Sequence, residues 1–178
     1  MLRVFGFDTI GVVIGDLYFV DPRPTRGQEG PEQGVRIELR HLVRDEPRGS
    51  IYAAVPIAVD EPIWRVDLLE SVDNGGSLDR AHHHPRFRGW NPGPRQFEPD
   101  LTADPVDWLG RQLTDLDTIL ARAEVDPASV GPGDADAMRS AVPEILGVVR
   151  ETLSQVVAGT LGHPTEATPE LGARAGWL

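Results

Sequence analysis

Apolar and charged residues alternate along residues 35–43, and this two-residue period constrains the fold more than any other feature of the chain. Val35, Ile37 and Leu39 fall on one side of the segment, while Arg36, Glu38 and Arg40 fall on the other. Successive side chains of a β-strand point to opposite faces of a sheet. The pattern therefore predicts a strand that is buried on one face only.

Further strands are predicted on both sides of this one. Alternating apolar residues indicate strands over 51–59 and 64–68, and residues 2–20 predict two or three more, with a tight turn at Gly15-Asp16. Pro56 removes a hydrogen-bond donor, so the strand that contains it is expected at an edge or a bulge. The segment 22–34 is rich in Pro, Gly, Glu and Gln, which is typical of an exposed loop.

The periodicity changes after residue 85. Residues 89–99 contain three prolines and two glycines and are expected to be irregular. Asp104-Pro105 then resembles a helix start, and a leucine stripe continues the predicted helix to about residue 123. A second helical region is predicted over 134–157, with an interruption near Pro143.

This order of elements predicts an α+β fold. Residues 1–88 would form a mostly antiparallel sheet, and the helices of residues 104–158 would cover one of its faces, since they need an apolar surface to pack on. We expect one domain over residues 1–178, with a disordered tail at 159–178.

Composition excludes several classes of function. The chain has no cysteine, and all 17 of its basic residues are arginine, so thiolate chemistry, lysine Schiff bases and a P-loop lysine are excluded. No run approaches the ~18 apolar residues of a membrane span, and no secretory signal is evident. We expect a cytoplasmic bacterial protein.

The net charge of −11 is unevenly distributed. Residues 1–97 hold 12 arginines and 14 acidic residues, whereas residues 98–178 hold 5 arginines and 14 acidic residues. An acidic C-terminal half repels nucleic acid, which argues against broad nucleic-acid binding. One segment of this acidic chain is basic. Residues 79–95 contain four arginines and one aspartate, together with three consecutive histidines, His82, His83 and His84.

The Asp-Asn-Gly-Gly segment at 73–76 predicts a hairpin between strands 62–71 and 78–84. A turn centred on Asn74-Gly75 would place Asp67 opposite His82 and Arg65 opposite His84. These side chains and Arg80 would share one charged, solvated face, while His83 would point into the core.

An Asp–His pair beside arginines favours acid–base chemistry on an anion. The carboxylate would orient the imidazole and raise its pKa, and a guanidinium would bind a phosphate or carboxylate through paired hydrogen bonds. We therefore predict catalytic roles for Asp67, His82 and His84. The predicted ligand-binding residues are Arg65, Arg80, Arg86, Arg88 and Trp90.

Two alternatives stay open. His82, His84 and Asp67 could form a two-histidine, one-carboxylate metal site, and the His-x-His step resembles the first metal motif of cupins. The glutamate and second motif of that family are missing, and the nearby arginines would repel a dication, so we expect no metal and no other cofactor. The second alternative is a non-catalytic module whose acidic helical half binds a protein partner.

The combination of Arg65-x-Asp67 with the histidine cluster resembles small toxins of bacterial toxin–antitoxin pairs, between Arg65 and His84 and with different spacing. The resemblance implies nuclease-like phosphoester chemistry. Phe87, Phe97, Trp90 and Trp108 are aromatic residues near the arginines. They are expected to anchor the irregular segment rather than to stack on a ligand.

Overall fold

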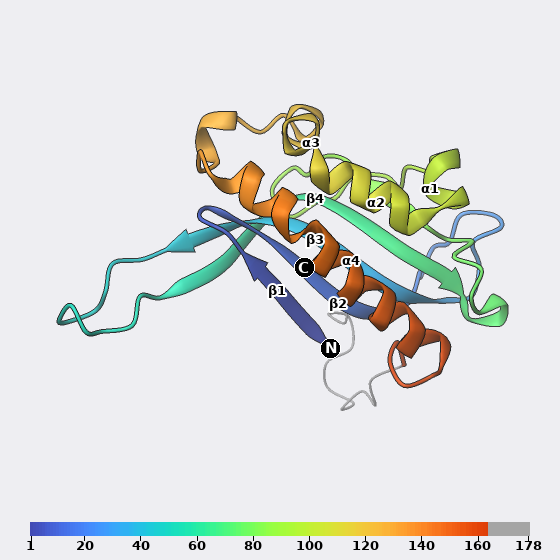
Figure 1. Cartoon of the computed structure of the whole chain (residues 1–178). Helices are drawn as coiled ribbons and strands as arrows, with labels where there is room; N and C mark the ends of the chain where they lie inside the picture. Colours follow the sequence, from blue (N-terminus) through green and yellow to red (C-terminus); the bar gives the residue numbers. More distant parts are fainter. Residues whose placement is uncertain (164–178) are drawn as a thin grey trace.

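The computed structural model describes residues 1–163 and has an α+β fold in which five strands precede the helices (Figure 1). The strands are β1 (Leu2–Gly6), β2 (Ile10–Val20), β3 (Pro31–Arg44), β4 (Ile57–Ser71) and β5 (His82–His84). Each strand pairs antiparallel with the next one along the chain, which gives the sheet order β1-β2-β3-β4-β5. The predicted fold class is confirmed.

The helices follow the sheet and lie on one of its faces (Figure 1). They are α1 (Pro99–Ala103), α2 (Pro105–Thr114), α3 (Leu116–Ala123) and α4 (Asp134–Val157), with single 3-10 turns η1 (Val72–Asn74) and η2 (Pro127–Ser129). On the sheet side the core consists of alternate residues of β2, β3 and β4, among them Ile14, Ile37 and Val66, which pair across the strands. Burial of such side chains stabilises the fold by about 1.5–3 kcal/mol each.

The helical region differs from the prediction at two places. Asp104 caps α2 as expected, but Asp115 caps a separate helix α3 by accepting a hydrogen bond from the Thr118 amide at 3.1 Å, so the predicted single helix is two. The interruption predicted near Pro143 is wrong, because α4 continues through it. Pro143 lies on the solvent side of α4, where water can satisfy the unpaired carbonyl, while buried residues before and after it hold the helix on the sheet.

The first reversal of the chain was also predicted at the wrong place. Gly15 and Asp16 lie within β2, and the turn falls at Asp8-Thr9. The carboxylate of Asp134, at the start of α4, accepts hydrogen bonds from the Asp8 amide at 2.7 Å and the Thr9 hydroxyl at 2.7 Å. A partner 126 positions away therefore fixes this turn, and a local pattern does not contain that information.

The β3–β4 hairpin extends beyond the helices as a projecting arm (Figure 1). The strand predicted over 51–59 is wrong for residues 51–56, which form the irregular tip of this arm, and β4 begins at Ile57. Ile51 and Tyr52 are 88% and 90% exposed. Within the described part of the chain, residues 51–56 have no neighbouring strand to pair with and no layer that covers them, so their alternating side chains are neither paired nor buried.

The outer segments complete the description. The loop predicted over 22–34 is shorter, because β3 already begins at Pro31, which pairs with Val20. Within residues 1–163, no helix combines the length and hydropathy needed to cross a membrane. The tail predicted over 159–178 lies outside the described residues from position 164 onward.

Candidate functional site

The register predicted for the last hairpin is confirmed. Asp67 pairs with His82 and Arg65 pairs with His84 across β4 and β5. The connection is longer than predicted, since β5 begins only at His82 and η1 lies between the strands. The register survives because the Arg80 amide donates to the Leu69 carbonyl at 3.0 Å, which continues the same pairing beyond the end of β5.

The face of the sheet opposite the helices carries a network of ion pairs across β3 and β4. Arg36 lies opposite Asp67 and donates to both of its oxygens, at 2.7 and 3.0 Å. Arg65 lies opposite Glu38 and donates to it at 2.7 Å, and Arg40 donates to the other oxygen of Glu38 at 2.9 Å. Cross-strand pairs of opposite charge stabilise a sheet, and the bidentate geometry fixes the orientation of both partners.

This charged face is buried, although the sequence predicted a solvated one. Asp67 and His82 are each 1% exposed, and Arg65 is 7% exposed. The covering layer is the irregular segment 85–98, whose sequence has no pattern typical of a helix or a strand. From this segment Phe87 lies 5.0 Å from the Arg65 guanidinium, and Phe97 lies 5.6 Å from the His82 ring.

Two contacts hold the covering segment in place. His83 and Gln96 exchange backbone hydrogen bonds at 2.9 Å in both directions. Arg95 donates to both oxygens of Glu32 at 2.9 Å, and Glu32 is buried at the start of β3. The neighbouring residues Arg95 and Gln96 therefore attach the segment to the start of β3 and to the edge strand β5.

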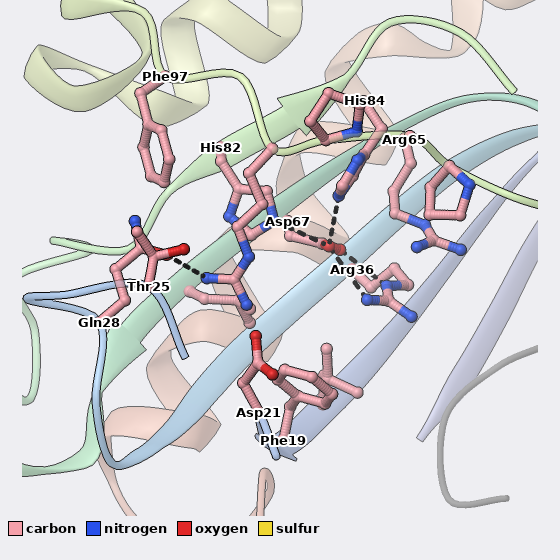
Figure 2. Close-up of a pocket in the computed structure, with 16 residues that line it drawn as sticks. Phe19, Asp21, Thr25, Gln28, Arg36, Arg65, Asp67, His82, His84 and Phe97 are labelled. Atoms are coloured by element: carbon pink, nitrogen blue, oxygen red, sulfur yellow. Dashed lines mark hydrogen bonds and ion pairs between the residues drawn. The ribbon is translucent and has the colours of Figure 1, made fainter. Parts of the chain in front are cut away.

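A cavity of about 670 Å³ remains between the sheet face and the loops above it. Its floor contains Arg36, Arg65, Asp67, His82 and His84, and Figure 2 shows Asp67 between the two histidines and the two arginines. The other lining residues come from the end of β2, the loop 21–30, β4 and the segment 92–97: Leu17, Phe19, Asp21, Thr25, Gln28, Leu69, Pro92, Gly93, Pro94, Arg95 and Phe97. A volume of this size is typical of small-molecule sites.

The two histidines of the floor have different hydrogen bonds. Nδ1 of His82 lies 2.7 Å from the Arg80 carbonyl oxygen, which can only accept, so Nδ1 carries a proton and donates it. Nε2 of His82 then faces Asp67 Oδ2 at 3.4 Å. Nε2 of His84 lies 3.8 Å from the same oxygen, and its Nδ1 is buried without a hydrogen-bond partner among residues 1–163.

Burial and charge set the protonation of Asp67 and His84. Burial raises the pKa of Asp67, but the Arg36 guanidinium and the hydrogen bond from His82 outweigh it, and the pKa lies well below its usual value. Burial, together with the positive charges of His82, Arg65 and Arg36, lowers the pKa of His84 to about 4 against the opposing effect of Asp67. Asp67 raises the pKa of His84, as expected for a carboxylate, but burial and the positive charges outweigh this effect, so His84 is neutral at pH 7.

Four predicted ligand-binding residues do not line the cavity. Arg80 contributes its carbonyl to His82, but its side chain donates to the Gly27 carbonyl outside the cavity. Arg86 pairs with Glu124, and Arg88 is exposed. Trp90 lies 4.9 Å from the Arg40 guanidinium, so it anchors the segment as the aromatic residues were expected to do.

His83 points to the other side of the sheet, as the alternation predicted. Its ring packs edge-on against Trp108 at 5.1 Å, and its Nε2 lies 3.0 Å from a Glu98 oxygen. Burial lowers the pKa of His83, although Glu98 opposes the shift. His83 therefore belongs to the core and not to the cavity.

Several residues of the site were missed at the sequence level. Arg36 and Glu38 occupy the charged positions of the 35–43 alternation, which therefore marks the charged face of β3 as well as its core face. Arg95, Phe19 and the loop residues reach the cavity through tertiary contacts and carry no local signal.

Asp67, His82 and His84 could also hold a divalent metal ion, since one ligand atom from each lies within 4.8 Å of the others. The bond from His82 Nδ1 to a carbonyl leaves Nε2 as the coordinating atom, which is a common arrangement for metal-binding histidines. However, Arg36 already binds both oxygens of Asp67, and the Arg65 guanidinium adds a second positive charge. The donor set fits a metal, whereas the surrounding charge disfavours one.

No protein-family model, no curated protein and no solved structure matches this chain. The function is therefore argued from the chemistry of the cavity.

Proposed function

We propose that this protein binds a small ligand bearing a phosphate or carboxylate group in the cavity on the sheet face opposite the helices. The observation that carries the proposal is the cavity floor, where the guanidinium groups of Arg36 and Arg65 lie beside two histidines. Burial lowers the pKa of Arg65, and the charge of Arg36 lowers it further, so the two cations repel each other where they meet. An anion between them would relieve this repulsion.

The hydrogen-bonding capacity of the two arginines supports the same ligand. Arg36 uses its Nε and Nη2 groups to bind Asp67, and Arg65 uses its Nε and Nη2 groups to bind Glu38. Nη1 of each has no hydrogen-bond partner among residues 1–163. Charge-assisted hydrogen bonds to guanidinium groups are the strong ones, and planar anions match their geometry.

The histidines suggest acid–base chemistry on a bound phosphoester. In such a step water attacks phosphorus while one neutral imidazole takes the proton of the water, and the P–O bond to the leaving group breaks as the other histidine, which enters the step as an imidazolium, protonates the leaving oxygen. The products are a phosphate and an alcohol. Asp67, held by Arg36, would orient His82 and His84 in this step, because it lies within 3.8 Å of both rings.

Calorimetric titration with inorganic phosphate and with acetate tests the binding proposal. Arg65→Gln should weaken binding by about 1.5–3 kcal/mol, which is the value of a hydrogen bond to a charged group. Arg80→Gln is the matched control. The Arg80 side chain is about as buried as that of Arg65, with 13% against 8% exposed, but it lies outside the cavity. Glu38 keeps Arg40 in the Arg65 variant, and melting curves would verify that both variants are folded.

Equal affinity in the wild type and in the Arg65 variant would reject the anion site and leave the partner-binding module as the better explanation. The turnover of a phosphomonoester and of a phosphodiester, each measured with His84→Asn, tests the catalytic step separately. Binding without turnover would retain the site as a binding site only.

A metal-dependent enzyme is the second candidate, because the three ligand atoms within 4.8 Å favour it. We expect elemental analysis of the purified protein to find no stoichiometric zinc, iron or manganese, and chelator to leave the melting temperature unchanged. About one metal ion per chain, lost on His82→Ala, would make the metal-dependent enzyme the preferred function.

A further inference from the structure

We propose that the ligand is an amphipathic organic anion whose charged group binds Arg36 and Arg65 and whose ring packs against Phe97 and Phe19. The inference rests on the proposed function and extends it to the class of ligand. Three properties of the cavity carry it: its volume, the division of its lining, and the exposure of Phe97.

The volume exceeds what an inorganic anion needs. The cavity measures about 670 Å³, whereas one water molecule occupies about 30 Å³ of liquid. A phosphate or carboxylate group on the floor would leave most of this space to solvent. Cavities of several hundred Å³ are typical of organic ligands, which fill them with an apolar body.

Above the charged floor the walls are largely apolar, and the one arginine among them is Arg95, whose guanidinium lies 5.9 Å from the Phe19 ring. Figure 2 shows Phe97 near His82 at one end of the cavity and Phe19 near Asp21 at the other. The other apolar lining residues are Leu17, Leu69, Pro92 and Pro94. Apolar walls with a few polar groups at one end are what fix the orientation of an amphipathic ligand.

Phe97 is 47% exposed although it lines a cavity. Its ring contacts His82 at a centroid distance of 5.6 Å, which places it next to the charged floor. Aromatic side chains contribute most when they are buried against another ring or an apolar surface. A ring-bearing ligand would cover Phe97 while its anionic group reaches the two arginines.

The loop 21–30 supplies polar groups at the edge of the cavity. Asp21, Thr25 and Gln28 line it, and Gln28 Oε1 accepts a hydrogen bond from Arg95 at 3.3 Å. These groups can hydrogen-bond to hydroxyl or amino substituents of a ligand, so they are compatible with a ring that is itself polar at its rim.

Paired probes that differ only in the ring test the inference. Phenyl phosphate is compared with inorganic phosphate, and benzoate with acetate, by calorimetric titration of the intact protein. We expect the ring to strengthen binding about tenfold or more in at least one pair, since burying an aromatic ring on an apolar wall contributes more than about 1.4 kcal/mol. In Phe97→Ala this gain should fall severalfold, while the affinity for the ring-free probe stays unchanged.

Tyr52→Ala is the control, because Tyr52 is an exposed aromatic residue at the tip of the arm and lies outside the cavity. It should leave all four affinities unchanged. Equal binding of ringed and ring-free probes, or a ring effect that persists in Phe97→Ala, overturns the inference while the anion site stands. Failure of all four probes to bind rejects the proposed function and the inference with it. Binding of phenol as tight as phenyl phosphate would show an apolar pocket without an anion site.

Discussion

At the scale of the residue, Asp67 is the centre of the site. Its carboxylate receives two hydrogen bonds from Arg36 and faces two histidines, and it is 1% exposed. A buried charge is tolerated only with such partners, and the removal of one partner leaves the other uncompensated. The geometry of the whole floor therefore depends on one ionised side chain.

Asp67→Asn should destabilise the fold by about 3–5 kcal/mol, because Arg36 would remain buried without its counter-charge. The free energy of unfolding from urea titrations checks this. Asp107→Asn is the control, since it breaks an ion pair with Arg111 on the exposed side of α2 and should cost less than about 1 kcal/mol. Similar losses in the two variants would contradict the buried ion pair.

The lowered pKa of His84 predicts how the free energy of unfolding depends on pH. Its pKa is about 4 in the folded chain, so between its ordinary value of 6.5 and 4 the unfolded chain binds the proton more readily. Stability should therefore fall as the pH decreases through this range, by at most about 3 kcal/mol from this residue. Asp67, whose pKa is lowered, adds a loss at still lower pH.

Urea unfolding at pH 7 and pH 4.5 measures the effect. In His84→Asn the loss between the two pH values should be clearly smaller, although His83 contributes in the same direction and keeps part of it. An identical loss in the wild type and in the variant would show that His84 is not held neutral by burial.

At the scale of the element, the close pairing of β3 with β4 positions the site. Gly34 adopts a φ of 153° opposite Leu69, and a Cβ there would lie 2.1 Å from the Leu68 carbonyl oxygen. The strands that carry Arg36 and Asp67 approach each other closely only because this position lacks a side chain.

Gly34→Ala should therefore lower the free energy of unfolding by about 1–3 kcal/mol, as overpacking does. Gly147→Ala is the opposite case. Gly147 lies on the exposed side of α4, and a Cβ added there would meet no atom within 4 Å. This substitution should therefore stabilise the helix by about 0.5–1 kcal/mol. An unchanged free energy of unfolding in Gly34→Ala would mean that β3 and β4 can move apart at this position without loss of stability.

The elements also show how far local sequence patterns are informative. The alternation on both sides of the turn signal at 73–76 was sufficient to predict the pairing of Asp67 with His82, because a period of two and a hairpin centre determine the register. The same alternation failed at 51–56, where no neighbouring strand pairs with it. Periodicity describes a residue's face, whereas burial depends on what covers that face.

At the scale of the whole molecule, the sheet separates two environments. The helices cover one face and form the core (Figure 1). The irregular segment 85–98 lies against charged residues of the other face and lines one side of the cavity. The first layer was predictable from leucine periodicity. The second was not, because a segment rich in Pro and Gly follows its tertiary contacts, such as Arg95 with Glu32, and has no period of its own.

The charge distribution is consistent with this division. Most of the net charge of −11 arises from residues 98–178, whereas the cavity draws arginines from β3, β4 and the covering segment. Because these arginines are largely buried, they present little positive surface to a long polyanion and favour a ligand small enough to enter the cavity.

The most direct measurement of the central claim is the position of a bound anion in crystals. Tungstate resembles phosphate and gives an anomalous signal, so a soak locates it without assumptions about chemistry. We predict one strong peak in the cavity, within hydrogen-bond distance of the Arg36 and Arg65 guanidinium groups and lost in Arg65→Gln. Peaks only at exposed arginines such as Arg88, with none in the cavity, would contradict the anion site.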